Sequence, residues 1–445
     1  MIRRLHALVA LMLVCGSAAG AADDPRDEQK PGSTIEAPVE FTPGERAAIL
    51  TLSPLPPPPP DPTNRVADDP RAARLGQAIF FDPRFSADGT VSCASCHDPA
   101  KGWGDGRALP PPERFGADLR HVPTLWNVAY NRWFFWDGRA DSLWSQALVP
   151  LEHPREHAGS RAQFQQLVRD DAPLRRAYQH VFGSLSPAAP EPAAADIDMT
   201  FANLGKALAA YQRRIVSRRA PFDVFVEGLR EGDAKKSAAI SPAAQRGLRL
   251  FVGRADCRSC HGGPNFSDAE FHDTGVAEAF DRVDRHDPGR FGGINALLSN
   301  PFNALGPMSD DPEGRTRHRT SFLVNSVEWR GHFKTPTLRN VATTAPYMHR
   351  GQIATLEGVI RFYSTLGAPP DDAELRASIA EKVRQRPVSP IRSSRPHAHG
   401  GAESEQVLRR LDLSPAEIAD LIEFLKSLTD TSLDPALMTP LELAE

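Results

Sequence analysis

Cysteine is scarce in this sequence, and long hydrophobic runs are missing after its first residues. Only five cysteines occur among 445 residues, and four of them belong to two short motifs. The formal net charge is −4, which is near neutral for this length and gives no reason to expect nucleic-acid binding. No stretch beyond the N-terminal segment is apolar enough for a membrane helix, so no membrane span is predicted.

Residues 1–21 have the pattern of a secretory signal peptide. The pattern consists of a positive start, a short apolar run and a small-residue cleavage site: Arg3 and Arg4, Leu8–Cys15, and Ala19–Ala21. A lipid anchor on Cys15 is the alternative, although Val14 is bulky for the position before a lipidated cysteine. The pattern predicts an exported, periplasmic protein from which the signal peptide has been removed.

Two Cys-x-x-Cys-His motifs carry the strongest chemical signal. They consist of Cys93, Cys96 and His97, and of Cys257, Cys260 and His261. In such a motif the two thiols can form thioether bonds to the porphyrin vinyl groups, and the histidine can ligate the iron. Covalent haem attachment also agrees with export. The motifs therefore predict two covalently bound haem c groups.

Other readings of the two cysteine pairs are weaker. A Cys-x-x-Cys pair can bind zinc or exchange disulfides, and two pairs can share one zinc ion. Neither alternative explains the histidine that follows both pairs, or the export signal. Two haems alone would suit an electron carrier, but a carrier needs about a hundred residues per haem, so the length of the chain indicates a further site.

The chain is predicted to be mostly α-helical, with two similar cytochrome c-like units in tandem. Each unit opens with a helix, continues through a haem motif and a long insert, and closes with an amphipathic helix. The spacing Gly76-x-x-x-Phe80 recurs as Gly247-x-x-x-Phe251 in the two opening helices. The predicted helix starts are Asp69, Ser241, Thr355 and Ser414.

The predicted domain organisation follows from these units. Residues 22–69 contain the proline run Ser53–Pro62 and are expected to form a weakly structured spacer. The insert Asp287–Arg315 is expected to be a flexible loop. The remaining parts are a first cytochrome c domain at 70–230, a second at 240–430 with the boundary near Glu227–Ile240, and a C-terminal tail at 431–445.

Several further motifs give the chain a resemblance to the bacterial dihaem cytochrome c peroxidases and their MauG-type relatives. They occur in a fixed order over roughly residues 70–430: Leu75–Asp82, the first haem motif, Phe135–Arg139, Pro336–Val341 and Thr344–Tyr347. The resemblance implies two cytochrome c domains, with hydrogen peroxide reacting at the N-terminal haem and electrons held at the C-terminal haem. It also implies an electron donor, which is a small cytochrome, a cupredoxin or an oxidisable protein substrate, and a homodimer, because relatives often dimerise.

The resemblance assigns roles around the first haem, whose proximal ligand is His97. Trp136 falls where the family has a tryptophan between the haems. Gln146, Pro150 and Glu156 fall at the distal-pocket positions. Glu156 can shuttle a proton as the O–O bond of peroxide breaks. Without the resemblance, Trp136 would be interpreted as a core aromatic and Glu156 as a surface glutamate.

The sixth ligand of the second haem, whose proximal ligand is His261, separates the subfamilies. Cytochrome c peroxidases use methionine there, and MauG-type enzymes use tyrosine. The counted position is Tyr363, on the inner face of a predicted helix, which makes the chain closer to the MauG type. A buried core tyrosine is the alternative interpretation of Tyr363. Met348 is the alternative ligand.

Three departures from the family pattern limit the resemblance. Thr344 and Pro346 fall where backbone carbonyls bind a calcium ion, but His121 replaces the usual asparagine, and imidazole is a poor calcium ligand. No histidine lies between Lys101 and Arg120 to block the first haem at rest. Ala255 stands where MauG has a tryptophan that oxidises its protein partner, so the substrate of MauG is not implied.

The leading prediction is therefore an exported dihaem enzyme that reacts with peroxide. The alternative is a dihaem electron-transfer protein whose two irons are both six-coordinate and which does not turn over.

Overall fold

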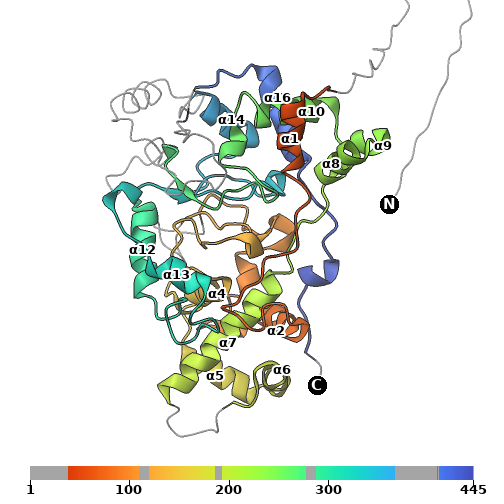
Figure 1. Cartoon of the computed structure of the whole chain (residues 1–445). Helices are drawn as coiled ribbons and strands as arrows, with labels where there is room; N and C mark the ends of the chain where they lie inside the picture. Colours follow the sequence, from red (N-terminus) through yellow and green to blue (C-terminus); the bar gives the residue numbers. More distant parts are fainter. Residues whose placement is uncertain are drawn as a thin grey trace, which may run out of the picture. The chain divides into compact units, whose positions relative to one another are not determined.

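Helices and short 3-10 turns make up nearly all of the regular secondary structure in the described part of the chain, as the sequence predicts (Figure 1). The computed structural model describes residues 39–109, 120–185, 193–276, 287–365, 408 and 410–443, so the predicted signal peptide lies outside the described residues. Among the described helices, none is long and apolar enough to cross a membrane. The elements are α1 (Pro43–Leu50), α2 (Pro70–Phe81), η1 (Pro83–Phe85), η2 (Cys93–Ser95), η3 (Pro99–Lys101), η4 (Val128–Tyr130), α4 (Leu143–Glu152), α5 (Arg161–Asp170), α6 (Ala172–Phe182), α7 (Ala194–Gln212), α8 (Pro221–Glu231), α9 (Ala234–Ser237), α10 (Pro242–Val252), η5 (Cys257–Ser259), β1 (Phe271–His272), α12 (Gly289–Ser299), α13 (Arg315–Ser321), η6 (Val327–Trp329), β2 (Phe333–Lys334), η7 (Val341–Thr343), α14 (Leu356–Thr365), α16 (Pro415–Lys426) and η8 (Pro435–Met438).

The predicted helix starts are confirmed, because each predicted residue caps its helix through its side-chain oxygen. The capping residues are Asp69 for α2, Ser241 for α10, Thr355 for α14 and Ser414 for α16. Such a cap satisfies a backbone N–H group that has no partner inside the helix, and it contributes about 1 kcal/mol. Local sequence therefore fixes where these helices begin.

The structure has two separate hydrophobic cores: most residues of one lie in residues 70–217, which we call the first half, and most residues of the other lie in residues 221–430, the second half. The first core is built around α2, α4 and α7, and the second around α8, α10 and α16. In the first half α2 packs against α7, and in the second half α10 packs against α16 (Figure 1). The hydrophobic residues of α8 belong to the second core.

The repeated glycines explain how these helix pairs come so close. A Cβ atom added at Gly76 would lie 1.9 Å from the carbonyl oxygen of Ala207, and one added at Gly247 would lie 2.0 Å from the carbonyl oxygen of Asp420. No side chain fits at either position. The two halves therefore use the same glycine contact to bring the opening helix onto the closing helix.

The aromatic residues of the repeated spacing also make matching contacts. The ring centroids of Phe80 and Tyr211 are 5.1 Å apart, and those of Phe251 and Phe424 are 5.0 Å apart. Tilted ring pairs at this separation contribute about 0.5–1.5 kcal/mol beyond the area that they bury. The spacing seen in the sequence thus reports equivalent packing in the two halves.

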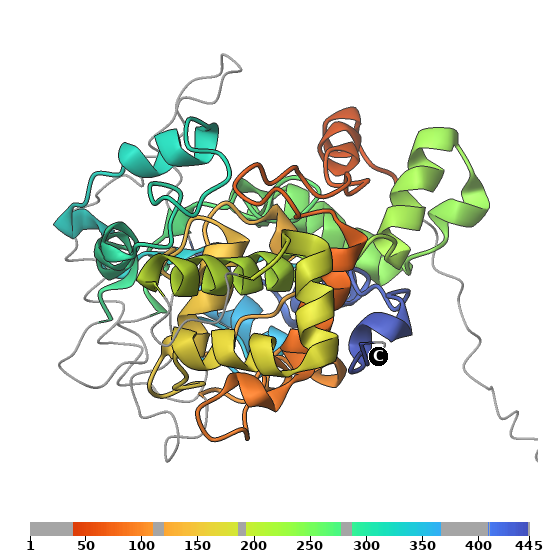
Figure 2. The same ribbon diagram turned by 90° about the horizontal axis from the view of Figure 1, so that it is seen from below.

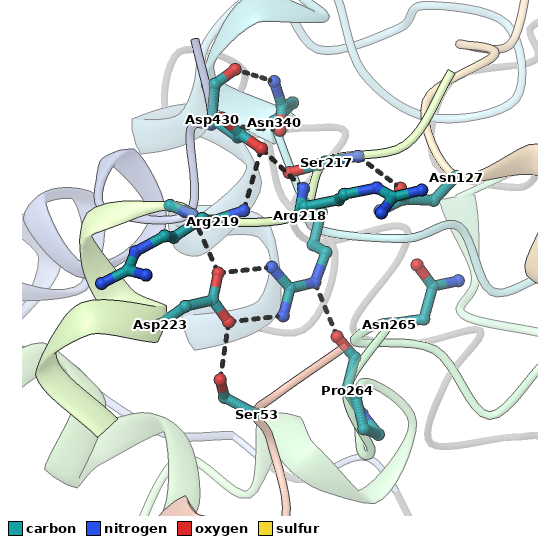
Figure 3. Close-up of polar contacts among 12 residues, drawn as sticks. Ser53, Asn127, Ser217, Arg218, Arg219, Asp223, Pro264, Asn265, Asn340 and Asp430 are labelled. Carbon is teal, nitrogen blue, oxygen red and sulfur yellow. Dashed lines mark hydrogen bonds and ion pairs between the residues drawn. The ribbon is translucent and has the colours of Figure 1, made fainter. Parts of the chain in front are cut away.

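A second shared motif, Pro-Thr-Leu-x-Asn-Val, begins at Pro123 and at Pro336. Its asparagine has a positive φ in both halves, 58° at Asn127 and 60° at Asn340. The Asn127 side chain accepts a hydrogen bond from the backbone N–H of Ser217 at 2.8 Å. The Asn340 side chain accepts one from Asp430 at 3.3 Å (Figure 3). Each asparagine thus ties its motif to the chain that leaves the closing helix of the same half.

The N-terminal segment is more ordered than the sequence predicts. Residues 39–69 contain α1, and Ile49 and Leu52 are buried in the second core, so the expectation of weak structure is wrong for this part. The Ser53 hydroxyl donates to the Asp223 carboxylate at 2.7 Å (Figure 3). The proline-rich composition does not predict α1, because this short helix is stabilised by residues far away in the sequence.

The C-terminal tail and the long insert also differ from expectation. In the tail, Leu437 of η8 is buried in the first core, and its carbonyl accepts a hydrogen bond from the Tyr211 hydroxyl. In the insert, the predicted loop contains α12, and Phe302 packs against Phe201 in the first core. Figures 1 and 2 show the consequence: α1 lies beside α8 and α10, and the C-terminal segment returns to the first half.

Replacing Gly76 or Gly247 by alanine should destabilise the protein. Alanine is normally the better helix residue, but its methyl group would meet a backbone carbonyl, so we expect the free energy of unfolding to fall by about 1–3 kcal/mol. Chemical denaturation followed by circular dichroism measures this. Gly44→Ala in α1 is the matched control, because open space surrounds Gly44. Equal stability of G44A and G76A would contradict the proposed helix contact.

Candidate functional site

Each haem motif forms one 3-10 turn at the edge of a core. η2 contains the first motif and η5 the second. In both motifs the histidine backbone N–H donates to the carbonyl of the first cysteine at 2.9 Å, from His97 to Cys93 and from His261 to Cys257. None of the four motif cysteines forms a disulfide bond. The two motifs therefore have the same local conformation.

The two histidines are oriented in the same way. The Nδ1 atom of His97 lies 2.9 Å from the carbonyl oxygen of Trp103, and that of His261 lies 3.0 Å from the carbonyl oxygen of Phe266. A carbonyl only accepts, so Nδ1 carries the proton and Nε2 keeps its lone pair free. Burial lowers the pKa of both histidines, which keeps the rings neutral. Both histidines are thus prepared as iron ligands.

The thiols do not support the two alternatives to haem attachment. Burial raises the pKa of Cys93 and of Cys257 to about 12, whereas thiol–disulfide exchange needs a thiolate. A zinc ion shared by both cysteine pairs would have to bring the two pairs together. The searched part of the chain holds one group of three metal-ligating side chains, Cys260, Asp268 and His272, and it contains only one motif cysteine.

Buried polar atoms in the first half fit a polar group that is not protein. Several buried side-chain atoms of the described residues have no hydrogen-bond partner, and they include the indole nitrogens of Trp103 and Trp126 and the Oε1 atom of Gln146. Buried polar atoms of this kind are rare in folded proteins without a ligand. These atoms fit a polar group bound in the first half, and the four cysteines outside disulfides and the two prepared imidazoles fit covalent haem attachment at both motifs.

The predicted distal residues lie on α4 and on the turn that follows it. Gln146 and Pro150 belong to α4, which is capped by Ser142. Glu156 is partly buried, with its carboxylate 3.4 Å from Nδ1 of His153. Burial raises the pKa of Glu156, and the charge of Arg139 opposes this shift.

The first haem motif lies close to this distal region. The Glu156 carboxylate acts electrostatically on the Cys93 thiol and raises its pKa further, although burial has the larger effect. Glu156 thus lies within electrostatic range of the first haem motif.

The predicted ligand of the second haem lies on α14. Tyr363 packs in a small cluster with Met348 and Phe362. Burial raises the pKa of Tyr363, and Cys260 and Cys257 raise it further, so Tyr363 lies within electrostatic range of the second haem motif. The predicted inward orientation of Tyr363 is confirmed.

Trp136 lies at the contact between the halves. Its carbonyl accepts a hydrogen bond from the backbone N–H of Lys334 at 2.8 Å, and its indole N–H donates to the carbonyl of His121 at 2.8 Å. The backbone N–H of His121 in turn donates to the carbonyl of His349 at 2.9 Å. One short run of hydrogen bonds thus joins Trp136 to the second half.

This contact is reciprocal. Lys334 stands at the same distance before the shared Pro-Thr-Leu-x-Asn-Val motif as His121, and His349 stands at the same distance after it as Trp136. Each half therefore donates and accepts one equivalent backbone hydrogen bond. Exchange of equivalent contacts is the signature of a two-fold relation.

His349 is a residue at this contact that the sequence analysis missed. Its ring stacks on Phe333 with centroids 3.7 Å apart and planes 11° apart. Burial lowers the pKa of His349 to about 3, so its ring is neutral. The signal that would have found it is the repeat itself, because His349 is the counterpart of Trp136.

The residues at the expected calcium position do not fit calcium. The ion prefers oxygen ligands, and His121 offers an imidazole whose Nδ1 hydrogen bonds to the Arg107 carbonyl at 2.8 Å. The backbone N–H and carbonyl of His121 are engaged with His349 and Trp136. Thr344 and Pro346 alone offer two of the six to eight oxygen ligands that calcium takes, so water would have to supply the rest.

The sequence and the fold are similar to those of known proteins. The family model for di-haem cytochrome c peroxidase matches residues 70–231. Cytochrome-c peroxidase IdrP1 of Denitromonas iodatirespirans is 33% identical over 373 residues, which is 82% of this chain and 85% of that protein. Methylamine utilization protein MauG of Methylorubrum extorquens is 35% identical over 301 residues, which is 66% of this chain and 69% of that protein.

A solved structure is also similar. A MauG-like protein associated with microbial copper homeostasis is 27% identical, with a TM-score of 0.59, and the match covers 87% of this chain and 98% of that chain. The chain therefore belongs to the di-haem cytochrome c peroxidase family. It is a peroxide-dependent oxidoreductase of the cytochrome-c peroxidase or MauG type, and membership implies two haem c groups.

Each motif is expected to hold its own haem, because the two motifs lie in separate cores. Replacing Cys93 and Cys96 by alanine should leave one covalent haem per chain, and so should replacing Cys257 and Cys260. The pyridine haemochrome absorbance and the mass of the intact chain give the haem number. Ser95→Ala is the control and should keep two haems. A single haem in the unaltered protein would contradict the assignment.

Proposed function

We propose that the protein is a MauG-type dihaem peroxidase with one cytochrome c domain in each half. Hydrogen peroxide is proposed to react at the haem ligated by His97, and electrons to enter through the haem ligated by His261. When bound, each haem supplies an iron that can gain and lose electrons. Because α8 belongs to the second core, we propose a domain boundary at 216–220 rather than at 227–240.

The difference between the equivalent helices α4 and α14 carries this proposal. Pro150 and Tyr363 stand at the same position after the capping residues Ser142 and Thr355. Proline has no ligand atom, so Pro150 leaves the first site open to peroxide. The oxygen of Tyr363 can act as the sixth ligand in the second half, as tyrosine does in other haem proteins.

Glu156 is proposed to move the proton that peroxide cleavage requires. As a carboxylate it removes the proton from one oxygen of peroxide and returns it to the other, which leaves as water. Its raised pKa brings it closer to the pH at which it works, which favours both steps. Gln146 is proposed to orient peroxide, because its buried Oε1 has no partner among the described residues.

Trp136 is proposed to carry electrons between the two haem sites. Its indole N–H is held by the His121 carbonyl, which is a hydrogen-bond acceptor but not a base. The indole can therefore lose and regain an electron without giving up its proton. The carbonyl dipole stabilises positive charge on the ring while the electron is absent.

The electron source is proposed to be a protein in the periplasm: a small cytochrome, a cupredoxin, or a partner with an oxidisable side chain. The names of the similar proteins do not identify the electron source, since three of them concern methylamine utilization and one solved structure concerns microbial copper homeostasis. Ala255 takes the place of the tryptophan that MauG uses against its partner, so we do not propose the MauG substrate.

Glu156→Gln should slow the reaction with peroxide by about 10²–10⁴-fold, because glutamine cannot take up a proton. In the unaltered protein the rate should fall as the pH drops through the raised pKa of Glu156, and the variant should lose this dependence. Stopped-flow absorbance of the first haem measures both effects. Glu152→Gln is the control, because Glu152 pairs with Arg161 at the end of α4. A normal rate in E156Q would exclude the proposed role.

Tyr363→Phe should change the low-spin spectrum of the second haem, because phenylalanine cannot ligate iron. Optical spectra and electron paramagnetic resonance of the oxidised protein test this. Tyr347→Phe is the matched control, since the Tyr347 hydroxyl donates to the Val341 carbonyl at 3.2 Å. An unchanged spectrum in Y363F would leave Met348 as the ligand to test.

A further inference from the structure

We propose that Arg120 is a positioning residue for Trp136, and that its guanidinium closes the contact between the halves without calcium. Together with Asp137 and Asp287, Arg120 forms a cluster that we call the guanidinium clamp. This inference rests on the proposed role of Trp136 between the two haem sites.

The clamp joins the two halves directly. The Nη1 atom of Arg120 lies 2.6 Å from the Asp137 carboxylate, and its Nη2 atom lies 2.7 Å from the carboxylate of Asp287. Its Nε atom donates to the second oxygen of Asp287 at 2.8 Å. Arg120 and Asp137 come from the first half, whereas Asp287 comes from the second.

The clamp is buried. The side chain of Arg120 is 15% exposed, and those of Asp137 and Asp287 are each 8% exposed. A charged pair in such surroundings is screened little by salt, and removing one partner leaves an uncompensated charge. Truncating Arg120 should therefore disturb the local geometry strongly.

The position of the clamp in the chain makes it relevant to Trp136. Asp137 directly follows Trp136, and Arg120 directly precedes His121, whose carbonyl holds the indole N–H. The clamp thus fixes two segments of the chain: the one next to Trp136 and the one next to His121, whose carbonyl accepts the hydrogen bond from the indole. Motion of either segment would move the ring relative to both haem motifs.

Other contacts hold the same turn from the second half. The Arg290 guanidinium donates to the carbonyl of Gly138 at 2.8 Å and to that of Asp137 at 3.3 Å. A Cβ atom added at Gly293 would lie 2.1 Å from the Asp137 carbonyl. α12 therefore approaches the turn closely, and Arg139 adds a further ion pair to Asp137 at 3.2 Å.

The clamp stays charged near neutral pH. Burial alone would raise the pKa of Asp287, but hydrogen bonding and the charge of Arg120 bring it down to about 2. Burial also acts against the charged form of Asp137, yet Arg139 and Arg120 hold its pKa below the usual value. Both carboxylates are therefore ionised and already paired with guanidinium groups.

The guanidinium clamp offers a calcium ion neither an unpaired carboxylate ligand nor a favourable charge. The carboxylates of the contact are occupied, and His121 offers a nitrogen instead of the amide oxygen expected of the family. A divalent cation would also be repelled by Arg120 and Arg290. At the contact where the family resemblance implies a calcium ion, the guanidinium of Arg120 provides the positive charge.

Stopped-flow measurement on the holoprotein tests the inference. The readout is the rate at which the absorbance of the second haem changes after peroxide is added, with the reaction of the first haem recorded in the same trace. Arg120→Gln should slow the second-haem change by about tenfold or more, because small displacements at such a site have large effects on rate. Haem content and the low-spin spectrum of the second haem should stay normal.

Two further variants make the result specific. Arg120→Lys keeps the charge but loses the bidentate geometry, and it should fall between the unaltered protein and R120Q. Arg132→Gln is the control, because Arg132 is 53% exposed and pairs only at the surface with Glu270. A normal second-haem rate in R120Q, or equal slowing in R132Q, would overturn the inference.

Trp136→Phe separates this inference from the proposed function. If W136F does not slow the second-haem change, the proposed role of Trp136 is wrong. If W136F slows it and R120Q does not, only the role of Arg120 is wrong.

The claim that the contact between the halves needs no calcium is tested on the unaltered holoprotein, so the test does not require any variant to fold. After dialysis against EGTA, the second-haem rate should be the same with and without added calcium chloride. A loss on dialysis that calcium restores would overturn the inference.

Discussion

A reciprocal pair of backbone hydrogen bonds between the two halves is the constraint on which the rest of the structure depends. His121 donates to the carbonyl of His349, and Lys334 donates to the carbonyl of Trp136. Both bonds are made by main-chain atoms at equivalent positions of an internal repeat. The place of Trp136 is therefore set by the backbone, and the guanidinium clamp only has to keep the surrounding chain from moving.

The proposed function depends on residues that differ at equivalent positions of the two halves. Equivalent turns hold two prepared histidines, and the helices α4 and α14 follow the two turns in the chain. One helix presents Pro150, which cannot ligate a metal, and the other presents Tyr363, which can. A single structural unit used twice thus yields one site proposed to be open to peroxide and one proposed to be closed.

Local sequence predicts much of the fold and of the site. The sequence predicts the haem motifs, the helix caps and the Gly76-x-x-x-Phe80 spacing because each of these features is formed by residues that lie close together in the chain. The helix α1, the insert that carries Phe302 and the buried Leu437 were missed, because each is stabilised by residues far away in the sequence. His349 was missed because its importance appears only when the two halves are compared. Its counterpart in the first half, Trp136, was identified through the family resemblance.

The central claim is that one haem site is open and the other is closed by a side chain. Electron paramagnetic resonance of the oxidised, peroxide-free holoprotein tests it most directly, since an open iron and a fully ligated iron differ in spin state. The account predicts one high-spin and one low-spin signal in equal amounts. Two low-spin signals, from irons that are both fully ligated, would contradict it.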